Sequence, residues 1–161
     1  SGQHSIDALR VLTASIDSPL GRLSVEECDG AVSALRWCGP EATAATPVLR
    51  EAVAQLEAYF AGKLRDFDLP LAPVGSAFQQ RVFAAMSAIP YGATRTYGAL
   101  AEDIDGFAQA VGQACGANPI PIIIPCHRVL AADGLGGYSG DGGVETKMVL
   151  LKLENAFPYL L

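Results

Sequence analysis

A cysteine and a histidine stand side by side at Cys126 and His127, directly after a run of isoleucines and prolines from Asn118 to Pro125. The β-branched isoleucines between prolines predict a short, rigid, buried, extended segment. Neighbouring side chains on a strand face opposite ways, so the thiol and the imidazole meet only if the chain bends sharply here. Such a pair would support nucleophilic chemistry, with the base activating the thiol. The residues alone also fit a core strand with an inert thiol, because free cysteines are commonly buried.

The first 74 residues predict a small antiparallel sheet followed by one helix. Thr46 and Pro47 suit the N-cap and the first position of a helix that continues to about Gly62. An extended linker follows, which places a domain boundary near Val74. The strands are expected where apolar and polar residues alternate between turn signals, at residues 10–17, 22–27 and 31–37.

The remainder of the chain predicts short helices around the Cys-His pair. Two of them, joined by the tight turn Ile104–Gly106, have the order of a helix-turn-helix, although two short helices alone are often only packing elements. We therefore expect an α+β protein, with the N-terminal sheet and helix packed on a mainly helical C-terminal domain. The helices are expected from Ser76 to before Pro90 and over residues 96–103, 107–117 and 146–155.

Composition narrows the class of protein further. Half of the 161 residues are apolar, yet no stretch of about 18 residues is unbroken and apolar, so we expect a compact soluble protein without a transmembrane helix. The four cysteines are irregularly spaced, the opening residues show no secretory signal pattern, and there are only two histidines. These features indicate reduced thiols in a cytoplasmic protein and no structural zinc site.

The block Ile-Pro-Cys-His-Arg-Val at residues 124–129 has Gly-Ala-Asn-Pro before it and Gly-Gly-Tyr-Ser-Gly after it. With these flanks it resembles the signature of the O6-alkylguanine-DNA alkyltransferases, and the detailed similarity extends from about Ala77 to Glu154. The resemblance implies a ribonuclease H-like domain over residues 1–74. It also implies an alkyltransferase and DNA-binding domain over residues 75–161.

The activity that this resemblance implies is direct repair of DNA. The thiol of Cys126 would take an alkyl group from O6 of guanine, with O4 of thymine as a further substrate, and keep it as a thioether. A thioether is not hydrolysed by a base in such a site, so the protein would act once, as a monomer and without a cofactor. Because O6 is inaccessible in a duplex, the guanine must first leave the stack. Double-stranded DNA is the expected partner, single strands are the alternative, and neither a membrane nor an obligate protein partner is expected.

The resemblance assigns roles to ten residues and no metal ligand. Cys126 is the nucleophile, His127 accepts its proton, and Glu154 orients the imidazole. Without the resemblance, Glu154 would be taken for a solvated helix residue paired with a lysine. The other seven hold the site or contact substrate and DNA: Asn118 ties the recognition helix to the active-site segment, Tyr97 stacks near the flipped base, Gln109 replaces that base in the duplex, Arg128 contacts substrate or DNA, and Val129, Tyr138 and Ser139 line the alkyl pocket.

Several features depart from the family's pattern. Gln109 stands where the family has an arginine, and residues 107–117 contain no lysine or arginine. The turn before this helix is shorter, and the loop after Tyr138 is longer and brings Asp141 near the DNA path. Either Phe107 or Gln109 acts as an uncharged wedge, or duplex repair is weak and single strands react better. In both cases the net charge of −6 predicts weak and strongly salt-sensitive DNA binding.

Two other classes of function remain open from the residues. A cysteine hydrolase would also use a Cys-His-Glu constellation, and turnover beyond one product per molecule would identify it. A module that senses alkylated DNA without repairing it would fit the missing basic residues, but it would not need Cys126. Full biological activity of a Cys126→Ala variant would support the sensing module.

Overall fold

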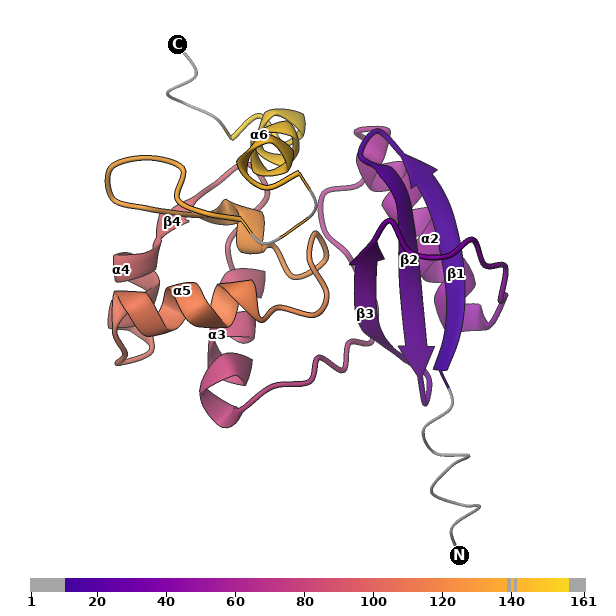
Figure 1. Ribbon diagram of the computed structural model, residues 1–161, viewed down its shortest axis with the longest axis horizontal. Coiled ribbons are helices and arrows are strands. Elements are labelled where there is room, and N and C mark those ends of the chain that lie inside the picture. The colour runs from indigo at the N-terminus through magenta and orange to yellow at the C-terminus, as the bar shows by residue number, and fades with distance from the viewer. Residues whose placement is uncertain (1–10, 139, 141, 157–161) are drawn as a thin grey trace, which may run out of the picture. The chain divides into compact units, whose positions relative to one another are not determined.

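The computed structural model describes residues 11–138, 140 and 142–156. The chain forms two compact units that divide between Pro73 and Val74. In Figure 1 the described part of the first unit forms a sheet with a helix, and the second unit is built mainly of helices. Among the described residues, no helix is both long enough and apolar enough to cross a membrane.

The sheet of the first unit has three antiparallel strands in the order β1-β2-β3. The turn between the second and third strands is tight because Asp29 and Gly30 both have positive φ, as a two-residue hairpin loop requires. These strands lie within a residue or so of the predicted stretches and occupy β1 (Val11–Ser18), β2 (Gly21–Cys28) and β3 (Ala31–Trp37).

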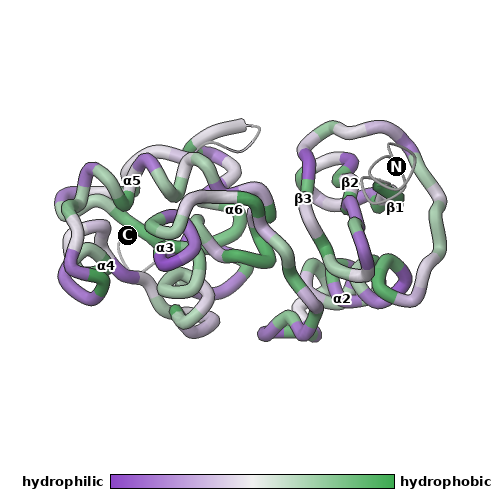
Figure 2. Tube along the Cα trace, turned by 90° about the horizontal axis from the view of Figure 1, so that it is seen from below, coloured by the Kyte–Doolittle hydropathy of each residue, from purple (hydrophilic) through white to green (hydrophobic). Residues whose placement is uncertain are grey.

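One helix, α2 (Pro47–Phe60), lies along a face of this sheet in both Figure 1 and Figure 2. It begins as the sequence predicts, since Oγ1 of Thr46 accepts a hydrogen bond of 3.1 Å from the backbone N–H of Leu49. Pro47 occupies the first turn, where a missing N–H leaves no bond unmade. The core of the unit consists of fully buried apolar side chains, which include Leu23, Val25, Val32, Leu49, Leu56 and Tyr59.

The second unit is mainly helical, and the predicted α+β class is confirmed. Its first helix, α3 (Ala77–Ser87), begins with a capping box: Ser76 Oγ accepts from Gln79 N at 3.1 Å, and Gln79 Oε1 accepts from Ser76 N at 2.8 Å. The next two helices pack on each other and on α3 in the helix-turn-helix order. The remaining helices are α4 (Tyr97–Asp103), α5 (Ala108–Gly116) and α6 (Val144–Leu153).

The turn between α4 and α5 is fixed by local contacts. The backbone N–H of Gly106 donates to Ala101 O at 2.8 Å, and the guanidinium of Arg81 donates to the carbonyl of Ile104. A Cβ atom at Gly106 would lie 3.0 Å from the ring of Phe78, so the close packing of this turn on α3 favours glycine. The N-cap residue of α5, Phe107, is therefore held in a defined position.

The isoleucine run does not form the predicted extended segment. It folds into a compact buried turn, in which Ile124 N donates to Ile120 O at 2.9 Å and Ile122 adopts a left-handed φ of 73°. Prolines at 119 and 121 cannot donate to a neighbouring strand, which favours a turn over a ladder. Extended pairing occurs instead in a two-residue parallel ladder between β4 (Arg95–Thr96) and β5 (Val129–Leu130).

Candidate active site

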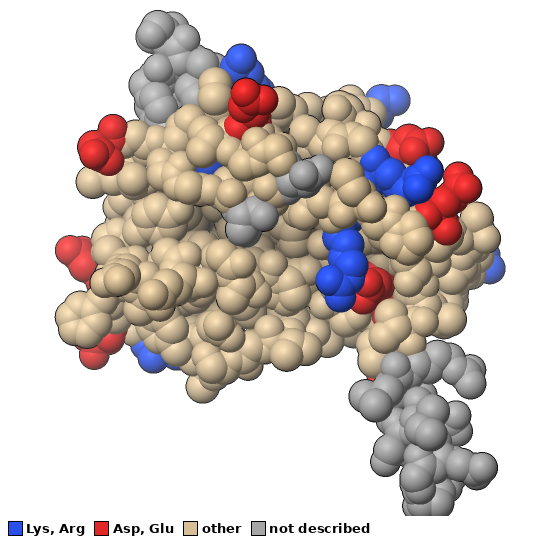
Figure 3. Space-filling view, viewed as in Figure 1, with Lys and Arg blue, Asp and Glu red and all other residues tan. Residues whose placement is uncertain are grey.

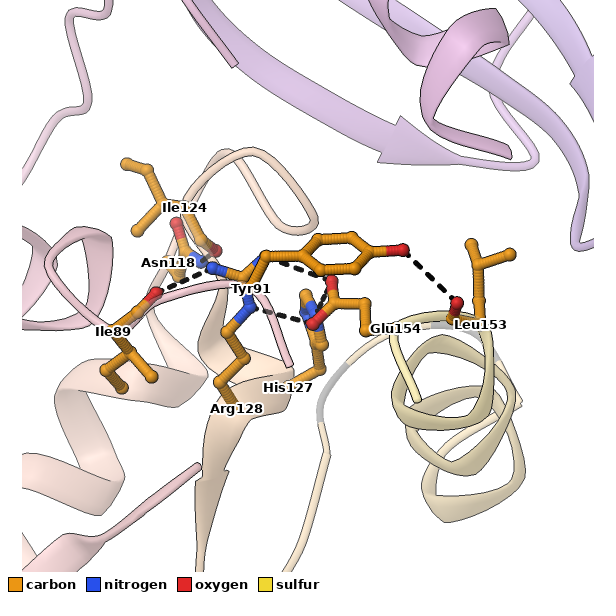
Figure 4. Close-up of polar contacts among 8 residues, drawn as sticks. All are labelled: Ile89, Tyr91, Asn118, Ile124, His127, Arg128, Leu153 and Glu154. Atoms are coloured by element: carbon orange, nitrogen blue, oxygen red, sulfur yellow. Dashed lines mark hydrogen bonds and ion pairs between the residues drawn. The ribbon is translucent and has the colours of Figure 1, made fainter. Parts of the chain in front are cut away.

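Asn118 holds the turn that leads to Cys126. Its side-chain amide donates to Ile124 O at 2.8 Å, and its Oδ1 accepts from Ile120 N at 3.0 Å. One side chain thus satisfies buried backbone groups at both ends of the isoleucine turn, as Figure 4 shows for Ile124. This geometry supports the expected link between the recognition helix and the active-site segment.

Cys126 and His127 lie in one turn of 3₁₀ helix, Cys126–Arg128, which Pro125 precedes. With three residues per turn, successive side chains point about 120° apart, so the thiol and the imidazole serve different surroundings. Cys126 lines a cavity, while His127 is fully buried and its Nε2 lies 2.7 Å from Oε2 of Glu154 (Figure 4). Among the described residues, no protein group hydrogen-bonds the buried Nδ1 of His127.

Glu154 is buried, with only 1 % of its surface exposed, and caps the C-terminal end of α6. This position contradicts the alternative of a solvated glutamate paired with a lysine. A carboxylate at the negative end of a helix needs compensation, which His127 and Arg128 provide by contacting both of its oxygens. The helix end thus fixes the carboxylate, and the carboxylate fixes the imidazole.

Arg128 lies in the interior and not on a DNA-facing surface, so the prediction that it contacts substrate or DNA is corrected. Its Nε and Nη2 donate to the two carboxylate oxygens of Glu154 at 2.8 and 3.1 Å, and its Nη1 donates to Ile89 O at 2.7 Å. The ring of Tyr91 lies 5.8 Å from the guanidinium carbon. A guanidinium engaged on all sides is unavailable to a phosphate, and Arg128 instead positions Glu154 (Figure 4).

The pKa values of Cys126 and His127 are shifted in opposite directions. Burial raises the pKa of the Cys126 thiol above 9.0, although hydrogen bonds from Asn118 and Tyr138 and the charge of Lys147 oppose the rise. Burial also lowers the pKa of His127 below 6.5, against the opposing contacts of Glu154. At neutral pH the imidazole is therefore uncharged and able to accept a proton.

Lys147 is a site residue that the sequence reasoning missed. It is fully buried on α6, and its ammonium donates to three carbonyls, those of Val129 at 2.6 Å, Leu135 at 2.5 Å and Gly137 at 3.0 Å. These bonds tie β5 to the loop that follows it. Burial lowers the pKa of Lys147 to about 8, while the nearby thiols of Cys126 and Cys115 act in the other direction. A sequence signal existed, since Lys147 falls on the same helical face as Leu150, Leu151 and Glu154.

A cavity of about 450 Å³ opens onto the thiol of Cys126. Burial raises the pKa of Tyr97 to about 12, and the ring of this residue also lies 5.8 Å from the ammonium of Lys147. A Cβ atom at Gly136, which has a φ of 71°, would lie 3.0 Å from the ring of Tyr97 and 3.2 Å from the backbone nitrogen of Ala131. Small and aromatic residues line the cavity: Tyr97, Gly112, Cys115, Gly116, Cys126, Gly137 and Tyr138.

Three residues were predicted to line the alkyl pocket: Val129, Tyr138 and Ser139. Tyr138 lines the cavity as expected, and burial raises the pKa of its hydroxyl well above 10.0. Val129 is fully buried in β5, outside the residues that line this cavity, and its carbonyl accepts a hydrogen bond from Lys147, so its pocket role stays a prediction. Ser139, like Asp141 of the lengthened loop, lies outside the described residues.

Cys115 is also at this cavity. Its thiol lies 3.5 Å from the sulfur of Met86, and only 6 % of its surface is exposed. Burial, together with the nearby Cys126, raises the pKa of Cys115 to about 12. Like Cys126, Cys115 therefore needs a base to lose its proton at neutral pH, and we take it for a wall residue of the cavity.

The N-terminal end of α5 presents Phe107 and Gln109 to solvent. Phe107 is 81 % exposed, and Gln109 is exposed two residues further along. The same helix reaches the cavity through Gly112, Cys115 and Gly116. Among the described residues, no cluster of three histidine, cysteine or acidic side chains has the arrangement of a metal site.

Both parts of the chain match families of known proteins. Residues 77–156 match the DNA-binding domain of 6-O-methylguanine DNA methyltransferase, and residues 11–73 match its ribonuclease-like domain. The chain belongs to the 6-O-methylguanine DNA methyltransferase family.

Individual relatives support this assignment. A methylated-DNA–protein-cysteine methyltransferase from Mycolicibacterium paratuberculosis is 47 % identical over 150 residues, which cover 87 % of this chain and 90 % of the relative. One from Methanosarcina acetivorans is 54 % identical over 110 residues, covering 66 % and 69 %. The crystal structure of Mycobacterium tuberculosis OGT in complex with DNA has a TM-score of 0.79 at 46 % identity, covering 89 % of this chain and 92 % of that one.

Proposed function

We propose that this protein repairs DNA by moving an alkyl group from O6 of guanine to the thiol of Cys126, once per molecule. The observation that carries this proposal is the placement of that thiol at an open cavity, with the neutral His127 and its buried partner Glu154 beside it. The names of the relatives as methylated-DNA–protein-cysteine methyltransferases agree with this assignment.

The reaction begins with a proton leaving the thiol. Burial keeps the pKa of Cys126 high, so a base must take the proton at neutral pH. The buried Nδ1 of His127, which no group of the described residues hydrogen-bonds, is suited to receive the proton through a water molecule, while Glu154 stabilises the imidazolium that forms. The thiolate then attacks the alkyl carbon, so a carbon–sulfur bond forms as the carbon–oxygen bond breaks.

Guanine leaves with the electrons of the broken bond and regains a proton, which restores the normal base. The product on the protein is a thioether, a poor leaving group that the neutral His127 does not hydrolyse. The reaction therefore ends after one transfer and uses no cofactor. The cavity volume of about 450 Å³ lies within the range of small-molecule sites, so it has room for a base turned out of the stack.

DNA is the partner that the family's DNA-binding domain implies, and we propose an O6-alkylguanine in a duplex as the substrate. The helix-turn-helix of α4 and α5 supports this choice, because α5 joins the exposed Phe107 and Gln109 to the cavity. Single strands remain the second substrate to test, since reaction there needs no base to be turned out of a duplex.

The test is the intact mass of the protein after incubation with a duplex oligonucleotide that contains O6-methylguanine. The expected result is one added methylene mass per molecule, located at Cys126 by peptide mapping and absent from Cys126→Ala. Cys115→Ala is the matched control, because this thiol lines the same cavity. No added mass with duplex, single strand or free O6-benzylguanine would refute alkyl transfer.

A module that binds alkylated DNA without repairing it is the second candidate, and the small number of available cations favours it. The same incubation separates the two functions, because a sensing module binds the modified duplex with an unchanged mass. Release of many product molecules per protein would instead indicate a hydrolase.

A further inference from the structure

Phe107 is the most exposed aromatic side chain at the helix-turn-helix. It is 81 % exposed, and the other large hydrophobic side chains that are exposed among the described residues are all valines. A phenylalanine in water forgoes a large apolar burial, so a bare one at a binding element indicates a surface that is covered in a complex.

The backbone holds this side chain in place. Phe107 is the N-cap residue of α5, and its carbonyl accepts a hydrogen bond of 3.0 Å from the N–H of Val111. On the other side, the packing of Gly106 on the ring of Phe78 fixes the turn. The side chain of Phe107 makes no capping hydrogen bond, so its removal leaves the helix start intact.

The DNA-binding domain offers few cations to phosphates. Residues 77–156 contain five lysines and arginines against seven aspartates and glutamates. Figure 3 shows the surface over α5 as largely free of charged side chains. Four of the five cations contact other groups of the protein: Arg81 the carbonyl of Ile104, Arg95 Asp103, Arg128 Glu154 and Lys147 backbone carbonyls.

The exposed ring and the cavity belong to one rigid element. Phe107 precedes α5, and Gly112, Cys115 and Gly116 of that helix line the cavity that holds the thiol. At about 1.5 Å of rise per residue, about 12 Å along the axis separates Phe107 from Cys115. The same helix can therefore place one side chain in the base stack and present the cavity to the base that is turned out.

We propose that Phe107 is the wedge of this protein: its ring enters the base stack next to the alkylated guanine and takes the place of that base. Apolar side chains insert between base steps without a charge, which suits a helix that lacks cations. Gln109, exposed two residues further along, then hydrogen-bonds the partner base left behind. This inference rests on the proposed function, since it concerns how the same cavity receives its substrate.

The test compares alkyl-transfer rates of Phe107→Ala, Phe107→Trp and the wild type on three substrates: duplex, single strand and free O6-benzylguanine. Phe107→Ala is expected to react with the duplex about tenfold more slowly, because a base–aromatic stack is lost. Its rate with the free base is expected to stay at the wild-type value, because no stack has to be opened. Phe107→Trp is expected to restore the duplex rate.

Val74→Ala is the matched control, since Val74 is also 81 % exposed but lies outside the helix-turn-helix. A duplex rate of Phe107→Ala close to that of the wild type would overturn the wedge, as would an equal loss on all three substrates. A loss in Gln109→Ala alone would assign the wedge to Gln109 and also overturn the proposal. If the wild type reacts with none of the three substrates, the alkyl transfer itself is refuted. That outcome differs from a refuted wedge, in which the wild type reacts and only the effect of Phe107→Ala is missing.

Discussion

Arg128 donates to both carboxylate oxygens of Glu154, at 2.8 and 3.1 Å, while His127 contacts one of the same oxygens at 2.7 Å. All three side chains are buried. The carboxylate is therefore shared between a permanent cation and the imidazole. Arg128 fixes the orientation of the carboxylate, and the carboxylate in turn sets the orientation of the ring.

Removal of the Arg128 side chain from its ion pair with Glu154 is expected to destabilise the fold. Arg128→Ala removes the guanidinium from the buried carboxylate of Glu154, and loss of one partner of a buried ion pair costs about 3–5 kcal/mol. Thermal or urea unfolding measures the loss. Arg128→Lys keeps the charge but not the two-pronged contact, so it should fall between Ala and the wild type. Equal stability of all three proteins would contradict the role given to Arg128.

The pH dependence of alkyl transfer should reveal His127 as the base. Its pKa is held below 6.5, so the neutral form persists down to that pH and the rate should fall only below it. His127→Gln lacks the base, and its rate should rise with pH toward and beyond 9.0, where the buried thiol begins to ionise unaided. Single-turnover rates with free O6-benzylguanine between pH 5 and 10 provide the measurement. A wild-type profile that matches the variant's would exclude His127 as the base.

Lys147→Met is expected to slow the reaction in two ways. Its ammonium lowers the pKa of Cys126, so the variant should have a higher thiol pKa. The carbonyls of Val129, Leu135 and Gly137 also lose their shared donor, which should loosen the loop that carries Tyr138.

The pH dependence of Cys126 modification by iodoacetamide measures the first effect, and hydrogen exchange of residues 131–138 measures the second. Lys152→Met is the matched control on α6, because Lys152 is exposed. A thiol pKa unchanged in Lys147→Met would contradict the electrostatic role.

Asn118→Ala should weaken the isoleucine turn. It removes the donor to Ile124 O and the acceptor of Ile120 N, and unsatisfied buried groups cost about 1–3 kcal/mol each. Asn118→Asp retains the acceptor but sets a charged oxygen against Ile124 O, so it should not recover the stability lost in Asn118→Ala. A thiol pKa above the wild-type value is expected in both variants, because Asn118 also lowers the pKa of Cys126. Wild-type stability of Asn118→Ala would refute this account.

Gln109→Arg is expected to tighten binding to alkylated duplex DNA. Of the cations in residues 77–156, only Arg81 and Lys152 are exposed, and Arg81 also donates to Ile104 O. With at most two phosphates neutralised, the logarithm of affinity should fall with the logarithm of salt concentration at a slope no steeper than about −2. Binding should therefore depend less on salt than the net charge of −6 predicted. One added arginine should steepen the slope by about 0.9. Unchanged or weaker affinity would count against the placement of Gln109 at the DNA.

Local signals in the sequence predicted most of the elements. Thr46 and Ser76 act as helix caps in the structure, and the turn at Asp29 and Gly30 separates two strands as expected. The failure at Ile122 has a physical reason: β-branched residues indicate a strand, but the flanking prolines and tertiary packing impose a left-handed φ. The ladder between β4 and β5 was missed because two residues a strand give no periodicity.

The site was predictable only in part. The roles of Cys126, His127 and Glu154 were predicted from the resemblance to a family motif. Such a motif identifies residues that act together even when they lie far apart in the sequence. Arg128 was assigned to substrate or DNA on the resemblance alone, and nothing local in the sequence indicates that it would contact Ile89 and Glu154. Lys147 was not given a role in the site, although its position on the apolar face of α6 conflicts with a solvated lysine.

Gly136 has a consequence for how this protein can vary. Any larger residue at this position would collide with the ring of Tyr97, which lines the cavity, and with the backbone of Ala131. The close packing of the loop on Tyr97 therefore depends on glycine. The loop is therefore held in place at Gly136, and an insertion after Tyr138 leaves this contact unchanged. A change of length beyond Tyr138 can thus be accommodated without moving the backbone that packs on Tyr97.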